Sequence, residues 1–238
     1  MLDESSDPPN SGDFEHPEHQ PASSPDPVAR EEVLRRVREA LGERRTKVRV
    51  DIPRGYRAEG SLLNGELQGL FIERVEDYKA TVTRCGPSDE AVAEAVRTTL
   101  EELSARVVVA PEEACARWLG APGPDRRVTV DDGSLTSEDL DTVDAVVTGS
   151  AVGIAETGTI VLDGSGASGR RILSLVPDVH VCVVRAADVV QTVPEALVEL
   201  DPERPLTFIS GPSATSDIEL SRVEGVHGPR TLRVILAG

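Results

Sequence analysis

Residues 143–171, VDAVVTGSAVGIAETGTIVLDGSGASGRR, combine two predicted strands with polar residues that could form a site. Two short apolar runs, residues 145–147 and 159–162, stand on either side of a polar turn that is rich in glycine and threonine. Short runs of β-branched residues bounded by glycine are typical of strands. Glu156 falls in the turn, and a buried carboxylate needs hydroxyl and N–H partners such as the neighbouring residues offer. The turn therefore indicates either a solvated glutamate or the carboxylate of a functional site.

Outward from this stretch, the chain alternates between predicted strands and predicted helices. The strands are expected at residues 80–84, 106–110, 128–130, 144–148, 180–184, 206–210 and 232–236. The helices are expected at residues 62–78, 88–103 with Ser88 as N-cap, 112–119, 137–140 and 194–200. Such alternation predicts an α/β fold, with a largely parallel sheet and helices on both faces. Ligands of such sheets bind beyond the carboxyl ends of the strands.

The N-terminal quarter of the chain differs in composition from the rest. Residues 1–27 are acidic and rich in proline, with almost no apolar side chains, so we expect a disordered tail. Residues 28–60 are expected to hold an amphipathic helix that ends at Gly42, followed by a basic connector. Residues 61–238 are expected to form the α/β domain.

Charge and cysteine content exclude several classes of function. The net charge of −17 disfavours nucleic acid as a partner, because nucleic-acid binding needs clustered lysine and arginine. The three cysteines, Cys85, Cys115 and Cys182, stand singly, so this chain alone is expected to hold neither a structural zinc ion nor an iron–sulfur cluster. No signal peptide and no membrane span are expected, and a cytoplasmic location fits best.

Three further segments contain residue types that can carry chemistry. Residues 210–219 (SGPSATSDIE) predict a strand end, a tight turn and a helix start capped by Ser213 or Thr215, which is a ready anion site or simply a cap. Residues 225–230 (GVHGPR) place His227 three residues before Arg230, as either a proton-transfer and anion-binding pair or a structural histidine. Residues 164–169 (GSGASG) match GxGxxG, but Pro177 leaves no room for the helix of a dinucleotide fold, which favours a Gly/Ser loop.

With these motifs in order, the chain resembles the lactate-utilization protein C family, whose members carry the LUD domain. The resemblance spans about residues 58–238 and rests on VTGSAVGIAETGTIVL, SGPSATSDIE and GVHGPRTLRVIL. It implies a fold similar to that of CoA-transferases, ribose-5-phosphate isomerase and glucosamine-6-phosphate deaminase. It also implies a role beside a cysteine-rich partner and an iron–sulfur partner in oxidising L-lactate to pyruvate, with the clusters on those partners.

The family's motif positions carry over to this chain residue by residue. We expect Glu156 and His227 in catalytic roles, and the following residues in binding a small organic acid or phosphate: Thr157, Gly158, Thr159, Gly211, Ser213, Thr215, Asp217 and Arg230. Two alternatives stay open: a stand-alone enzyme that acts on an acyl-CoA or a sugar phosphate through Glu156, and a module that senses an organic acid. All three hypotheses predict that the motif residues line one cleft along a rim of the sheet.

Overall fold

The computed structural model describes residues 27–42, 53, 55, 59–120, 126–215, 223–224 and 228–238. The chain divides into two units, residues 1–54 and 55–238. In the first unit, α1 (Pro27–Leu41) confirms the predicted amphipathic helix, and Arg35 pairs with Glu32 and Glu39 along it. Gly42 ends the helix with a φ of 56°. The predicted disordered tail and most of the basic connector lie outside the described residues.

The second unit is built on a six-stranded sheet in the order β1-β12-β7-β4-β2-β3. Every neighbouring pair in this sheet is parallel. Its strands are β1 (Thr81–Cys85), β2 (Val107–Pro111), β3 (Arg127–Asp131), β4 (Ala145–Thr148), β7 (Val179–Arg185) and β12 (Thr231–Ala237). The predicted strands lie within one residue of these bounds. β2, β4, β7 and β12 are apolar runs buried on both faces, whereas the edge strands β1 and β3 are partly exposed.

Helices cover both faces of this sheet, as predicted. On one face, α3 (Asp89–Glu102), α4 (Glu112–Ala114) and the π-helical turn η1 (Cys115–Leu119) pack on alternate strand residues such as Val108 and Val147. On the other face, α2 (Asn64–Asp77) and α5 (Ser137–Asp141) pack on the residues between them. Ser88 caps α3 as expected, since its hydroxyl accepts a hydrogen bond from the N–H of Ala91 at 3.2 Å.

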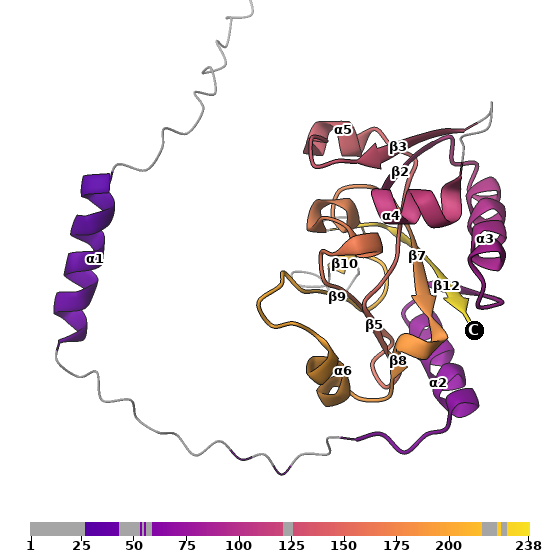
Figure 1. The fold of residues 1–238 in the computed structure, drawn as a ribbon, viewed down its shortest axis with the longest axis horizontal. Helices are drawn as coiled ribbons and strands as arrows, with labels where there is room; N and C mark the ends of the chain where they lie inside the picture. The colour runs from indigo at the N-terminus through magenta and orange to yellow at the C-terminus, as the bar shows by residue number, and fades with distance from the viewer. Residues whose placement is uncertain are drawn as a thin grey trace, which may run out of the picture. The chain divides into compact units, whose positions relative to one another are not determined.

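A second sheet of four strands, in the order β8-β5-β6-β9, lies on the same side as α2. It comprises β5 (Val152–Ile154), β6 (Thr159–Leu162), β8 (Val189–Val190) and β9 (Thr207–Ile209). Ile160 and Leu162 face the large sheet, whereas Val161 faces α6 (Val193–Glu199). Figure 1 shows α3 and α6 on opposite sides of the strands.

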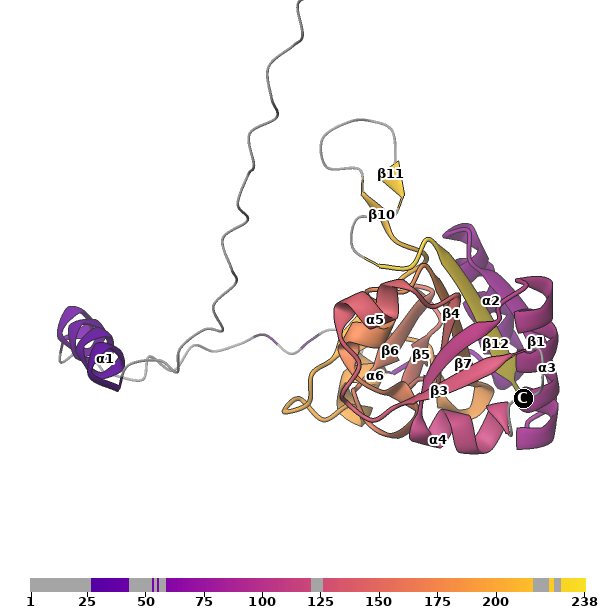
Figure 2. The ribbon, with the colours of Figure 1, turned by 90° about the horizontal axis from the view of Figure 1, so that it is seen from above.

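The structure corrects the predicted elements in two places. Within the stretch 148–159, which was expected to be a polar turn, Val152–Ile154 form β5, so only residues 155–158 turn. The predicted helix start after Ser213 is wrong, because Ala214–Thr215 form β10, which pairs antiparallel with β11 (Val223–Glu224). These two strands project from the domain as a separate ribbon (Figure 2). Among the described helices, none is long and apolar enough to cross a membrane.

Candidate functional site

Neighbouring strands β2 and β4 send the chain to opposite faces of the six-stranded sheet. After β2 the chain enters α4 and η1, whose Ala114 and Trp118 pack in the core under α3. After β4 it crosses to the other face and forms the four-stranded sheet. Parallel strands whose connections leave in opposite directions open a crevice at their carboxyl ends. The fold thus places its natural ligand site beyond the ends of β2 and β4.

A cavity of about 350 Å³ lies at this crevice, and we call it the switch-point cavity. Its charged and aromatic lining comprises Glu113, Arg117 and Trp118 after β2, Asp163 after β6, Arg185 at the end of β7 and Asp188 after β7. Ser150, Ser165 and Ser168 add hydroxyl groups to its wall. The volume falls within the range of sites for small organic ligands.

Gly149 allows the loop after β6, residues 163–169, to pack closely against the end of β4 beside the cavity. The N–H of Gly149 donates to the carbonyl of Ala167 at 2.7 Å, and a Cβ on Gly149 would lie 2.8 Å from that of Ala167. Ser165 donates to the carboxylate of Asp163 through its hydroxyl at 2.7 Å. This segment is the predicted Gly/Ser loop, and its function in the structure is to form one wall of the cavity.

Asp89, at the start of α3, connects three side chains that line the cavity. Its carboxylate accepts hydrogen bonds from Nε and Nη2 of Arg117, both at 3.1 Å, and from the indole N–H of Trp118 at 3.1 Å. Arg185 also donates to it and to the carbonyl of Pro87. The bonds from Arg117 and then Trp118 lower the pKa of Asp89 to about 2. Asp89 is therefore ionised at neutral pH and fixes both guanidinium groups.

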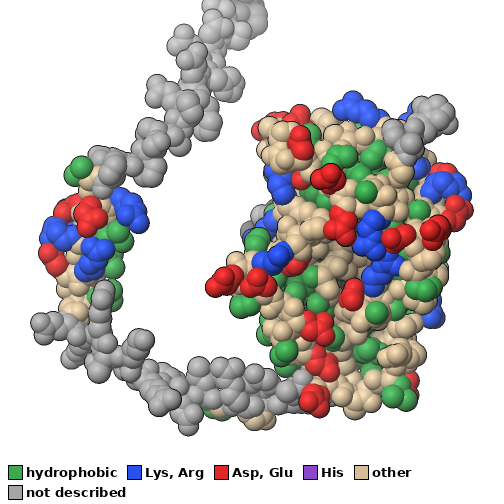
Figure 3. All heavy atoms as spheres, in the orientation of Figure 1, with side chains coloured by type: hydrophobic (Ala, Val, Ile, Leu, Met, Phe, Trp, Pro, Cys, Tyr) green, Lys and Arg blue, Asp and Glu red, His purple; other side chains and the backbone are tan. Residues whose placement is uncertain are grey.

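Carboxylates outnumber guanidinium groups around the cavity. Glu113, Asp163 and Asp188 line it together with two arginines, and Glu113 already pairs with Arg117 at 3.1 Å. Burial favours the neutral form of Asp163, yet bonds from Ser165 bring its pKa below the ordinary value. Figure 3 shows acidic and basic side chains intermixed around α4 rather than a continuous basic patch. The cavity therefore has a polar but not a cationic wall.

Behind the cavity, three polar side chains are fully buried between β4 and β7. The hydroxyl of Thr148 lies 2.7 Å from Nε2 of His180 and 3.7 Å from Sγ of Cys182, whose thiol donates to the carbonyl of Gly149. Burial lowers the pKa of His180 to about 4 and raises that of Cys182 to about 12. Both groups are therefore neutral at pH 7. Nδ1 of His180 has no hydrogen-bond partner among the described residues.

The first predicted motif lies at the far end of β5 and β6 from the cavity. Residues 149–151 and 163–168, at the open end of this hairpin, line the cavity, whereas residues 155–158 close its other end. Glu156 is exposed, and one of its oxygens accepts a hydrogen bond from the Gln191 amide at 3.0 Å. Gln191 in turn accepts from the N–H groups of Ser61 and Leu62 at 2.6 and 2.9 Å.

The other residues of this motif make contacts within the fold. The hydroxyl of Thr159 lies 2.7 Å from that of Thr157 and 2.8 Å from that of Ser210. Gly158 has a φ of 57°, and a Cβ there would lie 2.6 Å from the backbone of Arg74 in α2. The hairpin turn is thus joined to the end of β9 and to α2.

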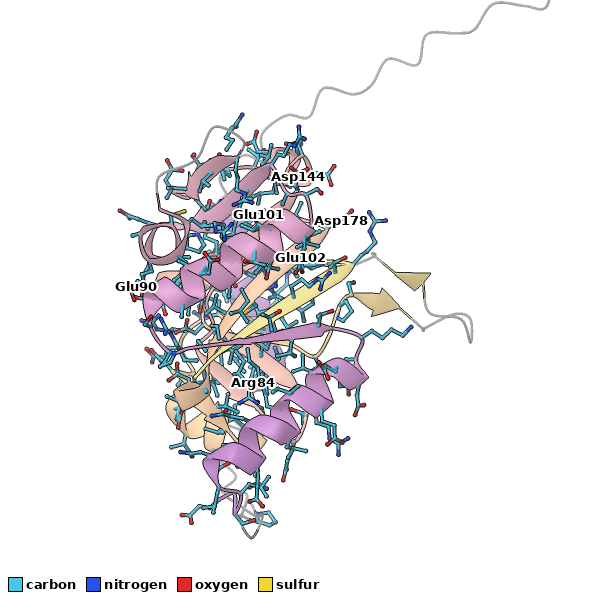
Figure 4. The ribbon with its side chains drawn as sticks, turned by 90° about the vertical axis from the view of Figure 1, so that its right-hand side faces the viewer. Arg84, Glu90, Glu101, Glu102, Asp144 and Asp178 are labelled. Carbon is cyan, nitrogen blue, oxygen red and sulfur yellow. The ribbon has the colours of Figure 1, made fainter. Side chains whose placement is uncertain are left out.

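The second and third motifs meet at the amino ends of β7 and β12. The N–H of Ser213 donates to the carbonyl of Pro229 at 2.8 Å, and Arg230 forms an ion pair with Asp178. Gly211, which has a φ of 89°, packs against Tyr78 at the end of α2. Figure 4 shows Asp178 on the side from which the ribbon projects and Glu90, the residue after Asp89, on the opposite side.

The predicted site residues are therefore only partly brought together. Hydrogen bonds connect the hairpin turn with Ser210 and Ser213 with Pro229, but the residues that line the switch-point cavity include none of the predicted ones. Thr215 lies in β10, and Asp217 and His227 lie outside the described residues. Arg230 directly precedes β12 and so lies at the amino end of that strand.

Sequence reasoning missed most of the cavity. Arg117, Trp118 and Arg185 belong to no recognisable motif. A local signal came only from the GxGxxG match at 164–169, with Asp188 near the offset of a ribose-binding acid, and that match was interpreted as a Gly/Ser loop. Within the described part of the chain, no cluster of three or more histidine, cysteine, aspartate or glutamate side chains is arranged to hold a metal ion.

Comparison with known proteins places the chain in a family. The LUD domain family model matches residues 30–237, so the match also covers most of α1 and the basic connector, which the motif resemblance left outside. Lactate utilization protein C of Deinococcus radiodurans is 46% identical over 189 residues, which are 77% of this chain and 85% of that protein. Lactate utilization protein C of Bacillus velezensis is 25% identical over 87% of this chain and 94% of its own length.

A solved structure agrees with the fold. The crystal structure of a DUF162 family protein from Deinococcus radiodurans superposes with a TM-score of 0.58 at 39% sequence identity. The superposition covers 75% of this chain and the whole of that one. Profile, relatives and structure thus agree, and the chain belongs to the LUD domain family.

Proposed function

We propose that this chain is the subunit without clusters of an assembly that oxidises L-lactate to pyruvate in the cytoplasm. The observation that carries the proposal is the 46% identity to a lactate utilization protein C over most of both chains. Oxidation of lactate to pyruvate releases two electrons and two protons, so the assembly needs electron acceptors. We assign these acceptors to iron–sulfur clusters on a cysteine-rich partner and an iron–sulfur partner.

The cysteines of this chain support the assignment of the clusters to partner proteins. An iron–sulfur cluster needs several thiolate ligands at close spacing. Cys115 and Cys182 are buried, and burial raises the pKa of both thiols, so neither is available as a thiolate. The half-buried Cys85 also has a raised pKa because of burial.

We further propose that a small anionic ligand, an organic acid or phosphate, binds at the corner that Ser213 and Arg230 form at the amino end of β12. The hydrogen bond from Ser213 to Pro229 holds the two motifs side by side there. Arg230 is exposed, and a guanidinium offers paired donors to a carboxylate or phosphate. Its partner Asp178 orients it through a bond to Nε at 2.9 Å. Glu156 and His227 keep their predicted catalytic roles in this proposal.

The role in lactate oxidation predicts a growth defect and a stable complex. Deletion of the gene from its native organism should abolish growth on L-lactate as the sole carbon source, while growth on pyruvate continues. The tagged full chain should copurify with partners that carry iron–sulfur absorbance. Normal growth of the deletion strain on L-lactate, together with recovery of the chain alone, would refute the proposal.

We call this site at Ser213 and Arg230 the anion corner. If it binds the ligand, Arg230→Ala should slow lactate-dependent growth at least about 10-fold, since a charged hydrogen-bond partner of the ligand is lost. Arg84→Ala is the matched control, because Arg84 is an exposed arginine of β1 whose described bond is to Gln68. The control should grow at the normal rate, and both variants should still copurify with the partners. Equal growth of the two variants would show that Arg230 does not bind the ligand.

The two alternative functions stay predictions from sequence. A stand-alone enzyme that uses Glu156 requires that Glu156→Gln abolish turnover of an acyl-CoA or sugar phosphate. The bond from Gln191 gives Glu156 a second explanation, as a residue that orients the Gln191 amide toward Ser61 and Leu62. An organic-acid sensor requires that lactate, pyruvate or phosphate raise the melting temperature of the isolated chain.

A further inference from the structure

The switch-point cavity has charges that do not suit a free anion. Its arginines are already engaged, since Arg117 bonds to Asp89 and Glu113 and Arg185 bonds to Asp89 and Pro87. Three carboxylates line the same space. A phosphate or a dicarboxylate there would face these carboxylates at short range, and such like-charge contacts are repulsive. The ligand of this cavity therefore differs from that of the anion corner, and the inference is independent of the proposed function.

Asp188 supplies an acceptor that the fold itself does not use. Its side chain lines the cavity at the end of η4 (Ala186–Asp188) and is half-buried. Within the described residues it takes part in no hydrogen bond or ion pair. A half-buried carboxylate without a protein partner needs a donor from solvent or from a ligand. Asp163, by contrast, is already bonded to Ser165 and paired with Arg204.

Donors and acceptors are both present around the same space. The hydroxyl of Ser150 donates to the carbonyl of Val183 at 3.1 Å and keeps its lone pairs for a further donor. Each guanidinium has five N–H groups, and those of Arg185 that Asp89 and Pro87 do not take up can still donate. A hydroxyl group donates and accepts at a single atom, so a ligand with several hydroxyl groups satisfies such a mixed wall without adding charge.

The volume sets the size of the ligand. At about 30 Å³ for each water-sized unit, the cavity of about 350 Å³ holds roughly a dozen non-hydrogen atoms. A three-carbon hydroxy acid would fill about half of that space. A sugar of five or six carbons, with its oxygens, fills it.

We propose that the switch-point cavity binds an uncharged ligand with several hydroxyl groups and the size of a monosaccharide. One ligand hydroxyl donates to the carboxylate of Asp188. Others accept from the guanidinium of Arg185 and donate to Ser150. An ammonium-bearing ligand of the same size is the competing occupant, because carboxylates outnumber guanidinium groups around the cavity, and its binding in place of an uncharged probe would contradict the proposal.

Tryptophan fluorescence of the full chain tests this proposal directly. The chain has one tryptophan, Trp118, which lies in the cavity wall and is 5% exposed. The probes are D-ribose, D-glucose and myo-inositol, with L-lactate, inorganic phosphate and spermidine as charged comparisons. At least one uncharged probe should give a saturable change with a Kd of about 5 mM or tighter, as expected for about a dozen atoms. The charged probes should give none.

A pair of variants then locates the binding. Asp188→Asn should raise the Kd of the uncharged probe at least about 10-fold, because an ionised acceptor is lost. Asp141→Asn, at the exposed end of α5, is the control and should leave the Kd unchanged. Saturable binding of phosphate, lactate or spermidine that Asp188→Asn weakens would overturn the proposal. So would no response to any uncharged probe up to about 100 mM, or equal affinities in the two variants.

Discussion

Gly158→Ala should lower the free energy of unfolding by about 3 kcal/mol, and the melting temperature by about 6–12 °C. Two costs combine at this position. A φ of 57° is unfavourable for any residue with a Cβ, and that Cβ would lie 2.6 Å from the backbone carbon and oxygen of Arg74. These backbone atoms belong to the last turn of α2, and they cannot move aside as a flexible side chain can. Urea denaturation of the full chain measures the effect.

Gly65→Ala is the matched control for this substitution. Gly65 lies in the first turn of α2 with no positive φ, and nothing lies within 4 Å of its Cβ position. Alanine there should be neutral or stabilise the domain by up to about 1 kcal/mol. If Gly158→Ala proves as stable as Gly65→Ala but abolishes growth on lactate, Gly158 acts in ligand binding rather than in packing.

Acidification from pH 7.5 to pH 5 should lower the free energy of unfolding by about 2 kcal/mol because of His180 alone. Burial lowers the folded pKa of this histidine to about 4, against an ordinary value of 6.5. Below pH 6.5 the unfolded chain therefore binds a proton that the folded chain does not. The stability from the neutral imidazole is complete above pH 6.5 and falls as the pH drops toward 4.

His180→Gln separates this effect from the titration of carboxylates. The variant keeps a polar group beside Thr148 but has no imidazole to protonate. Its own loss of unfolding free energy between pH 7.5 and pH 5 should be smaller by about 2 kcal/mol, whatever its absolute stability. Two parallel pH profiles would assign the acid sensitivity to other groups.

The regular elements of the large sheet could be predicted because their signals are local. RVVVA and VHVCVVR are apolar runs that both faces of the sheet bury, and Ser88 is a cap within its own turn. β5 was missed because Gly153 interrupts a three-residue strand, and glycine there avoids Phe71 and Val184. Such a reason exists only after the strand has packed against α2 and β7.

The ribbon of β10 and β11 and the cavity depend on contacts between distant segments. Residues 213–219 contain the serine, threonine and acidic residues of a helix cap, but pairing with β11 overrides that local preference. The cavity was expected at the carboxyl ends of the strands, and it does lie there. Its lining could not be predicted, because Arg117, Asp163 and Asp188 are neighbours only through the strand order, which the sequence does not state.

The place of β12 has a consequence for how the protein is made. This strand lies between β1 and β7, follows both of them in the sequence, and pairs in parallel with each. While the ribosome is still synthesising residues before 231, β1 has no strand to join. Closure of the large sheet therefore waits until translation of this region is nearly complete. A nascent chain released before that point would expose the unpaired edges of β1 and β7 to chaperones and proteases.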